Sequence, residues 1–134
     1  MIKQPARLYT AVIGIFLLLQ GTSTLLFRLY PALDAAFPPL LTVTQMIPPH
    51  SILHILTGLL ALGALLWGGE RGPLWFAAGF GVFYVGLAVM GMLTGQPDFL
   101  GMQPFDHPFH LVVGVPGLAA AGIQYTSVKR KKIA

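Results

Sequence analysis

Residues 74–94 read LWFAAGFGVFYVGLAVMGMLT, a continuous apolar run that contains no charged side chain. About 20 helical residues cross the hydrocarbon layer of a bilayer, so a run of this length predicts a membrane-spanning segment. Barrel strands alternate between apolar and polar residues, and this run does not. Because lipid offers no hydrogen-bond partners, the backbone groups of such a segment must pair with one another, as they do in an α-helix. The stretch therefore predicts a transmembrane helix.

Three more apolar runs of similar length are present, at residues 8–27, 50–67 and 107–124. The composition agrees, because 55% of the 134 residues are hydrophobic and only 9% are charged, whereas about 25% are charged in soluble domains. Membrane lipids are therefore the expected surroundings. We expect an all-α membrane protein, with four transmembrane helices in a single domain that covers residues 1–134.

Basic residues are distributed unevenly over the connections between the runs. They precede the first run, lie between the second and third, and follow the fourth, at Lys3, Arg7, Arg71 and residues 129–132. The opposite connections contain Arg28 as their only basic residue. Since Lys and Arg are retained on the cytoplasmic side, we expect both termini in the cytoplasm. The pI of about 9.8 then reflects topology rather than a basic face, which argues against nucleic acid as a partner.

The connections also differ in structure. Residues 28–49 are apolar and rich in proline, and a short interfacial helix is expected near residues 32–37. The turn at residues 68–73, GGERGP, is suited to ending one helix and starting the next. The second and third helices are therefore expected to be antiparallel neighbours.

A repeat links the two halves of the chain. A shift of 56 positions aligns MIPPHSILHILTG, from residue 46, with MQPFDHPFHLVVG, from residue 102, and the shared pattern is M-x-P-x-[HD]-x3-H-x3-G. The first and third runs match loosely at a different offset, with Gly14 and Gly21 opposite Gly79 and Gly86. We expect a duplicated helical hairpin, with repeats at residues 8–67 and 74–124 related by a pseudo-twofold axis along the membrane normal.

All four histidines of the chain lie in the two copies of this motif, together with one carboxylate. They are His50, His54, Asp106, His107 and His110. Residues four apart lie about 40° apart around a helix, so each leading residue shares a stripe with the histidine that follows it. If the two motifs face each other across the bundle, these side chains meet near the extracytoplasmic face.

The chain resembles a bacterial family of small four-span membrane proteins that is classed as a domain of unknown function. The second and fourth helices of that family open with H-x3-H-x3-G and D-x3-H-x3-G motifs. The matching residues here are His50, His54 and Gly58, then Asp106, His110 and Gly114. The family commonly has an amide after the leading residue, where this chain has Ser51 and His107. The resemblance implies a four-helix fold in the bacterial cytoplasmic (inner) membrane, and no agreed activity.

A transition-metal site is the first hypothesis for the polar residues. Imidazoles and a carboxylate suit zinc, copper, iron or nickel, and two helices that each give a pair of ligands could complete the site. His54 and His110 are the expected principal ligands, assisted by His50, His107 or Asp106. Alternatively, Asp106 orients His110 through a hydrogen bond.

Two variants of this hypothesis depend on neighbouring residues. If Met46 and Met102 converge on the site, copper is favoured. Haem requires His54 and His110 as axial ligands, with the motif glycines leaving room for the macrocycle. The same glycines are explained equally well by close helix packing.

The competing hypothesis has no ligand or cofactor. The polar residues then start the helices and hydrogen-bond one another, with Asp106 as an N-cap. The chain is then an accessory or assembly subunit that packs against another membrane protein or a second copy of itself. Proton handling is a further alternative for histidines, although no continuous polar path supports transport. An enzyme is not favoured, because no nucleophile elbow, phosphate loop, H-E-x-x-H or dinucleotide motif is present.

Overall fold

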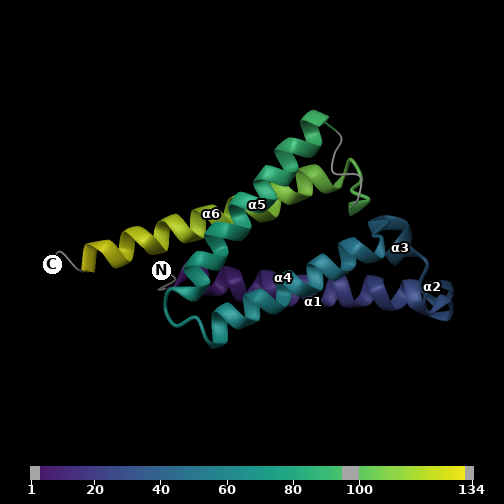
Figure 1. The fold of residues 1–134 in the computed structure, drawn as a ribbon, viewed down its shortest axis with the longest axis horizontal. Coiled ribbons are helices and arrows are strands. Elements are labelled where there is room, and N and C mark those ends of the chain that lie inside the picture. Colours follow the sequence, from purple (N-terminus) through teal and green to yellow (C-terminus); the bar gives the residue numbers. More distant parts are fainter. Residues whose placement is uncertain (1–3, 95–99, 132–134) are drawn as a thin grey trace.

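The computed structural model describes residues 4–94 and 100–131, with side chains as far as residue 127. Within these ranges the protein is all-helical and contains no strand. Four long helices and two short ones follow one another along the chain (Figure 1). They are α1 (Pro5–Leu29), α2 (Pro31–Ala36), α3 (Pro39–Thr44), α4 (Pro48–Leu66), α5 (Gly72–Thr94) and α6 (Asp106–Lys131).

Proline and aspartate mark where several helices begin. The first residues of α1, α2, α3 and α4 are all prolines, at positions 5, 31, 39 and 48. Proline is favoured there because its φ is already helical and it has no N–H to leave unpaired. Asp106 is the first residue of α6, where a negative charge is favourable. The short helix expected near residues 32–37 is present as α2, whereas α3 was not expected.

Three of the long helices, α1, α4 and α5, are long and apolar enough to cross a membrane. Large apolar side chains cover their outer faces, as at Leu19, Leu60 and Leu93, which are 64%, 67% and 79% exposed. Such faces are compatible with contact to lipid. The fourth predicted run coincides with α6, and its crossing of a membrane stays a prediction.

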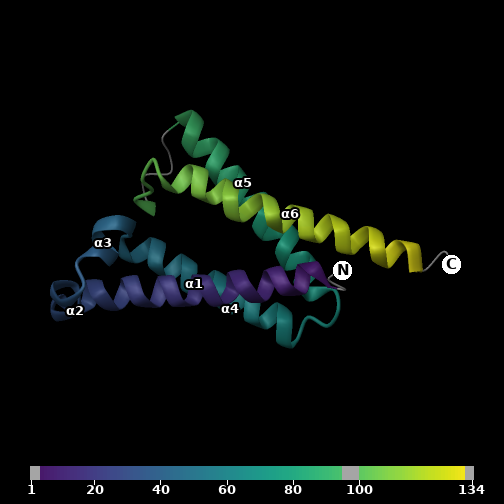
Figure 2. The ribbon, with the colours of Figure 1, turned by 180° about the vertical axis from the view of Figure 1, so that it is seen from behind.

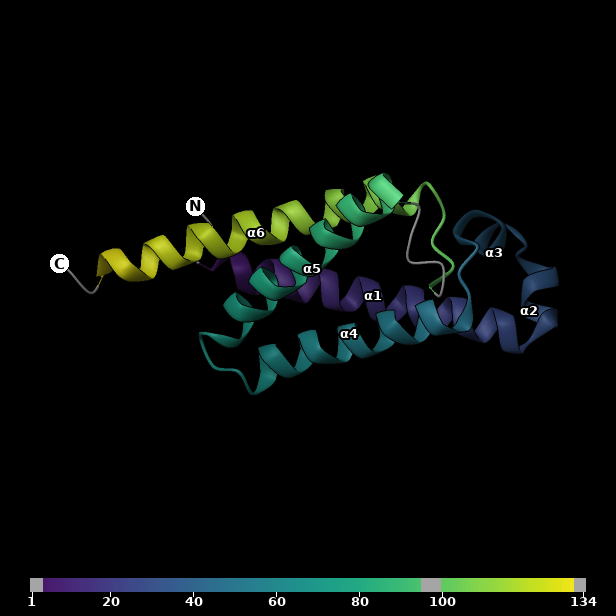
Figure 3. The same ribbon diagram turned by 45° about the horizontal axis from the view of Figure 1, so that its top comes forward.

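The long helices pair into two hairpins. α1 packs mainly along α4, and α5 packs mainly along α6, with less contact between the pairs. The start of α1 and the end of α6 lie at one end of the molecule, and α2 and α3 lie at the other (Figures 1 and 2). Figure 3, with the top turned forward, shows α2 and α3 at the end of the molecule where α1 ends and α4 begins.

Glycines stand where the two helices of each hairpin approach most closely. A Cβ atom built on Gly58 would lie 3.0 Å from the carbonyl oxygen of Gly14. A Cβ atom built on Gly114 would lie 3.2 Å from the carbonyl oxygen of Gly81. Any larger residue would push the helices apart, so these four positions set the spacing within each hairpin.

In the structure, the glycine of α5 that corresponds to Gly14 of α1 is not Gly79, which the sequence match suggested. A Cβ atom built on Gly79 or Gly86 meets nothing within 4 Å, so neither glycine is needed for helix contact. Gly81 instead occupies in α5 the place that Gly14 occupies in α1. The sequence match compared residue types only. Which glycine of α5 corresponds to Gly14 depends instead on which side of α5 faces α6.

In the described residues the two hairpins meet through a small apolar core and three hydrogen bonds, one of which runs from the Thr10 hydroxyl of α1 to the Pro73 carbonyl oxygen of α5 at 3.1 Å. The core contains Ile13 and Leu17 of α1 and Phe80 and Tyr84 of α5. The Tyr9 hydroxyl donates to the carbonyl oxygen of Val113 at 2.6 Å, and the backbone N–H of Ala6 donates to Gln124 Oε1 at 3.0 Å. These last two hydrogen bonds join α1 to α6.

Candidate functional site

A cavity of about 140 Å³ lies between the two hairpins at the α2–α3 end of the molecule. Its walls come from α1, from the end of α3 and the turn that follows, and from the starts of α4 and α6. We name it the histidine cavity. Its polar and sulfur-containing lining residues include Gln20, Met46, His50, His54, Asp106 and His110.

Three histidines are buried around this cavity. The ring centroids of His50 and His54 lie 4.7 Å apart, edge to face, because the two residues are one turn apart on α4. The ring centroid of His110 on α6 lies 6.3 Å from that of His50. The three side chains are only 2–3% exposed. The sequence motifs on α4 and α6 therefore do meet across the bundle.

Tyr84 of α5 packs against two of these histidines. Its ring centroid lies 4.8 Å from that of His110, edge to face, and 6.5 Å from that of His54. Its other side stacks on Phe80 at 4.0 Å. Tyr84 thus separates the imidazoles from the apolar core and restricts their movement.

Several polar atoms around the cavity are buried without a hydrogen-bond partner in the described part of the chain. They are Gln20 Oε1, His50 Nδ1, His110 Nδ1, and both Nδ1 and Nε2 of His54. An unsatisfied buried polar atom costs about 1–3 kcal/mol. Native proteins have few such atoms, and those that occur are commonly satisfied by ordered water or an ion.

Asp106 closes the turn that starts α6. Its Oδ2 accepts a hydrogen bond from the backbone N–H of Gln103 at 2.7 Å, and its own N–H donates to the carbonyl oxygen of Gln103 at 2.8 Å. In the described part of the chain no hydrogen bond joins Asp106 to His110. The Asp106 carboxylate is therefore hydrogen-bonded to the backbone of its own turn, although Asp106 also lines the cavity.

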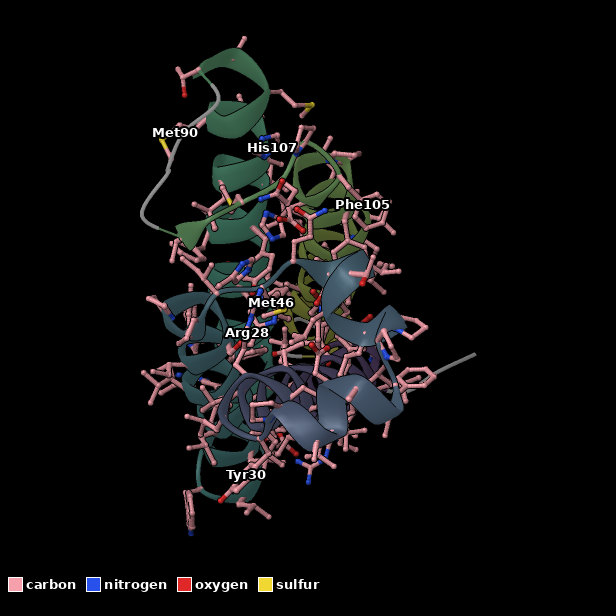
Figure 4. The ribbon with its side chains drawn as sticks, turned by 90° about the vertical axis from the view of Figure 1, so that its right-hand side faces the viewer. Arg28, Tyr30, Met46, Met90, Phe105 and His107 are labelled. Carbon is pink, nitrogen blue, oxygen red and sulfur yellow. The ribbon has the colours of Figure 1, made fainter. Side chains whose placement is uncertain are left out.

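His107 does not line the histidine cavity with the other three histidines. Its ring lies directly against Gly91 of α5, and Figure 4 shows His107 beside α5. The position directly after the leading residue of the motif faces the partner helix in both hairpins. Ser51, its counterpart in the repeat, likewise faces α1, where its Oγ lies 2.8 Å from Thr24 Oγ1.

Met46 lines the cavity from the turn between α3 and α4, and its side chain is only 2% exposed. Arg28 Nε donates to the carbonyl oxygen of Met46 at 3.0 Å, and Figure 4 shows the two residues side by side. Met102 is not a lining residue of the histidine cavity. The two methionines of the repeat therefore do not converge on it.

The predicted metal ligands do not form one set. In residues 4–94 and 100–131, no group of three or more His, Cys, Asp and Glu side chains is placed to hold a metal ion. His107 is turned to α5, and Asp106 is bound to its own turn. His50, His54 and His110 remain around one cavity, without forming such a group.

Haem does not fit this arrangement. The space of about 140 Å³ is well below the range of about 300–1,000 Å³ that is typical of small-molecule sites. Gly58 packs against α1 and Gly114 against α5, so neither leaves room for a macrocycle. The glycines of the motif serve helix packing instead.

Gln20 and Tyr84 complete the surroundings of the histidines and were not predicted as site residues. In the sequence Tyr84 is an isolated polar residue within an apolar run, and Gln20 comes shortly before three small polar residues at positions 22–24. A polar side chain at membrane depth was the available signal. Their direction depends on how α1 and α5 are rotated against the other hairpin, which the sequence motifs do not specify.

Comparison with known proteins gives a family and nothing more specific. No curated protein and no solved structure matches this chain. The sequence model of one family, described as Domain of unknown function (DUF4383), matches residues 7–124, which include all four long apolar runs. The chain therefore belongs to the DUF4383 family of unknown function.

Proposed function

We propose that this protein binds a transition-metal ion in the histidine cavity, through imidazole nitrogens of His50, His54 and His110. The observation that carries this is the environment of His54. Its side chain is 3% exposed, and both of its ring nitrogens are buried without a hydrogen-bond partner in the described residues. Imidazole is the commonest metal ligand among side chains, and a bound ion would satisfy such nitrogens.

The spacing of the rings limits which of them can share one ion. A metal–nitrogen bond of about 2 Å on each side, and roughly 1 Å from each nitrogen to its ring centre, place two ligating rings at most about 6 Å apart. The observed centroid separations from His50 are 4.7 Å to His54 and 6.3 Å to His110. His50 and His54 are within this limit, and a small shift of α6 towards α4 would bring His110 within it as well.

The proposed setting is the bacterial cytoplasmic membrane, with α6 as the fourth span and both termini in the cytoplasm. A four-span chain returns to the side on which it started, and α1 begins at the end of the molecule where α6 ends (Figure 1). In the sequence, every basic residue except Arg28 falls in a connection assigned to that side. The histidine cavity then lies near the extracytoplasmic face.

We also propose that the two hairpins arose by duplication, and the buried positions support this. A shift of 67 positions, which takes Ala6 to Pro73, carries every described buried residue of α1 onto a buried residue of α5. A shift of 56 positions does the same for Ser51, His54 and Gly58 of α4. The cavity would then lie where the two copies of the motif meet.

Metal titration of the detergent-purified protein tests the proposed site. We expect near-stoichiometric binding by the wild type, and an affinity at least about tenfold weaker in His54→Ala. The matched control is His107→Ala, which removes a buried histidine outside the cavity and should leave the affinity unchanged. Thermal unfolding without metal checks that each variant is folded.

Two results would overturn the proposal. One is a wild-type protein that takes up none of zinc, copper, iron or nickel. The other is an equal loss of affinity in His54→Ala and His107→Ala, which would indicate a general structural effect. Either result would favour the alternative function, an accessory subunit or homo-oligomer whose histidines are purely structural.

A further inference from the structure

Met46 gives the histidine cavity a sulfur donor. Its buried side chain lines the same space as His50, His54 and His110. The chain contains no cysteine, so thioether sulfur is the only sulfur ligand that it can offer. A thioether is a soft ligand, and soft ligands select soft metal ions.

The backbone around Met46 is held on both sides. Gln45 ends α3 in the left-handed conformation, with φ of 47°, and so turns the chain towards α4. Arg28 Nε fixes the carbonyl oxygen of Met46 itself, and Ile47 is extended before the proline that starts α4. This local structure holds Met46 at the cavity wall before any ligand arrives.

The donor set discriminates between metals. Zinc sites use three or four nitrogen, sulfur or oxygen ligands in a tetrahedral arrangement. In the described residues no three His, Cys, Asp and Glu side chains are placed to provide them. Monovalent copper accepts fewer ligands and prefers imidazole and thioether over carboxylate or water. A pair of cavity histidines with Met46 therefore suits monovalent copper better than zinc.

We propose, on the basis of the metal-binding function proposed above, that the ion is Cu(I) and that Met46 ligates it together with the cavity histidines. Nothing in this binding step requires a change of oxidation state. Met102, at the same place in the second repeat, is outside the cavity and is expected to take no part.

Competition for Cu(I) with a coloured chelator, under anaerobic reducing conditions, tests this assignment on the full-length protein. We expect the wild type to bind Cu(I) more tightly than Zn(II), and Met46→Leu to weaken Cu(I) binding at least about tenfold. Met102→Leu is the matched control and should bind Cu(I) as the wild type does. Leucine conserves the volume of methionine, so both variants should fold.

The outcomes separate this inference from the function on which it rests. Cu(I) binding by Met46→Leu at wild-type affinity would overturn the role of Met46. Tight binding of Zn(II) but not Cu(I) by the wild type would overturn the choice of metal and leave the proposed metal site standing. A wild-type protein that binds neither ion would overturn both.

Discussion

At the scale of single residues, His54 stands out among the described side chains as a buried polar group without hydrogen bonds. It is 3% exposed, it lies between His50 and Tyr84, and neither of its ring nitrogens has a hydrogen-bond partner in the described residues. A leucine of similar size would fill this place without leaving polar atoms unsatisfied. The proposed metal binding would account for a histidine at this position, whereas packing alone would not require one.

Replacement of His54 by leucine should leave the ligand-free protein as stable as the wild type, or more stable by up to about 1–3 kcal/mol. The reason is that the substitution removes two unsatisfied polar atoms and keeps the packing volume. The free energy of unfolding in detergent, from denaturant titration, measures the effect. Leu17→Ala is the control for a packing residue and should cost about 2–5 kcal/mol.

A loss of more than about 1 kcal/mol in His54→Leu would contradict this interpretation. It would mean that His54 makes stabilising hydrogen bonds, as the hypothesis of a structural helix clamp requires. The ligand-binding hypothesis also predicts that this variant loses metal affinity, whereas purely structural histidines leave no metal affinity to lose.

At the scale of helices, the close crossings within each hairpin hold the site together. Gly14 with Gly58, and Gly81 with Gly114, let the backbones approach and fix how α4 and α6 are rotated. His54 and His110 lie one turn before Gly58 and Gly114, on the same helices. The direction of each histidine therefore depends on the glycine that follows it.

Alanine substitutions in α5 test this account of the crossings. Gly81→Ala should destabilise the protein by about 1–3 kcal/mol, because the new Cβ atom would lie 2.8 Å from Leu118 and 2.9 Å from the Gly114 carbonyl oxygen. Gly79→Ala is the matched control on the same helix. It should be neutral or slightly stabilising, because nothing lies within 4 Å of its added Cβ atom.

Comparison of the free energies of unfolding of the two variants tests which side of α5 faces α6. Equal effects at the two positions, or a larger loss in Gly79→Ala, would mean that α5 faces α6 with a different side. Gly81 would then no longer correspond to Gly14, and part of the support for duplication would be lost.

At the scale of the whole molecule, the two hairpins meet with apolar packing and hydrogen bonds from α1 to α5 and α6, and they enclose the histidine cavity near α2 and α3. In the proposed orientation this end faces the extracytoplasmic side. Any ion would then enter from outside the cell, past α3 and the start of α6.

Single cysteines can test this orientation cleanly, because the chain has no cysteine of its own. Ala35→Cys in α2 should react with a membrane-impermeant maleimide in intact cells. Glu70→Cys between α4 and α5, and Ser127→Cys near the end of α6, should react only after permeabilisation. Labelling of Ser127→Cys in intact cells would show that α6 does not return to the cytoplasm, and the four-span topology would be wrong.

Much of the fold could be predicted from the sequence, because continuous apolar runs and proline positions are local signals. The long helices coincide with the four predicted runs, and the histidines at motif positions four apart do meet around one cavity. Both results follow from helix geometry within a single segment.

The side chains that complete the site could not be predicted in the same way. The sequence places His107 within one turn of His110, but the tight contact of α6 with Gly91 turns it away from the cavity. Conversely, Gln20 reaches the cavity and Tyr84 packs against its histidines from helices that carry no motif. These directions depend on how the helices rotate against one another, which is a property of packing between segments.

X-ray absorption fine structure of the metal-loaded protein tests the central proposal most directly, because it reports the atoms bound to the ion. We predict the scattering pattern of imidazole ligands in the wild type, unchanged in His107→Ala and lost in His54→Ala. A shell of oxygen atoms alone, or an imidazole pattern that persists in His54→Ala, would contradict the proposal that the histidine cavity is a metal site.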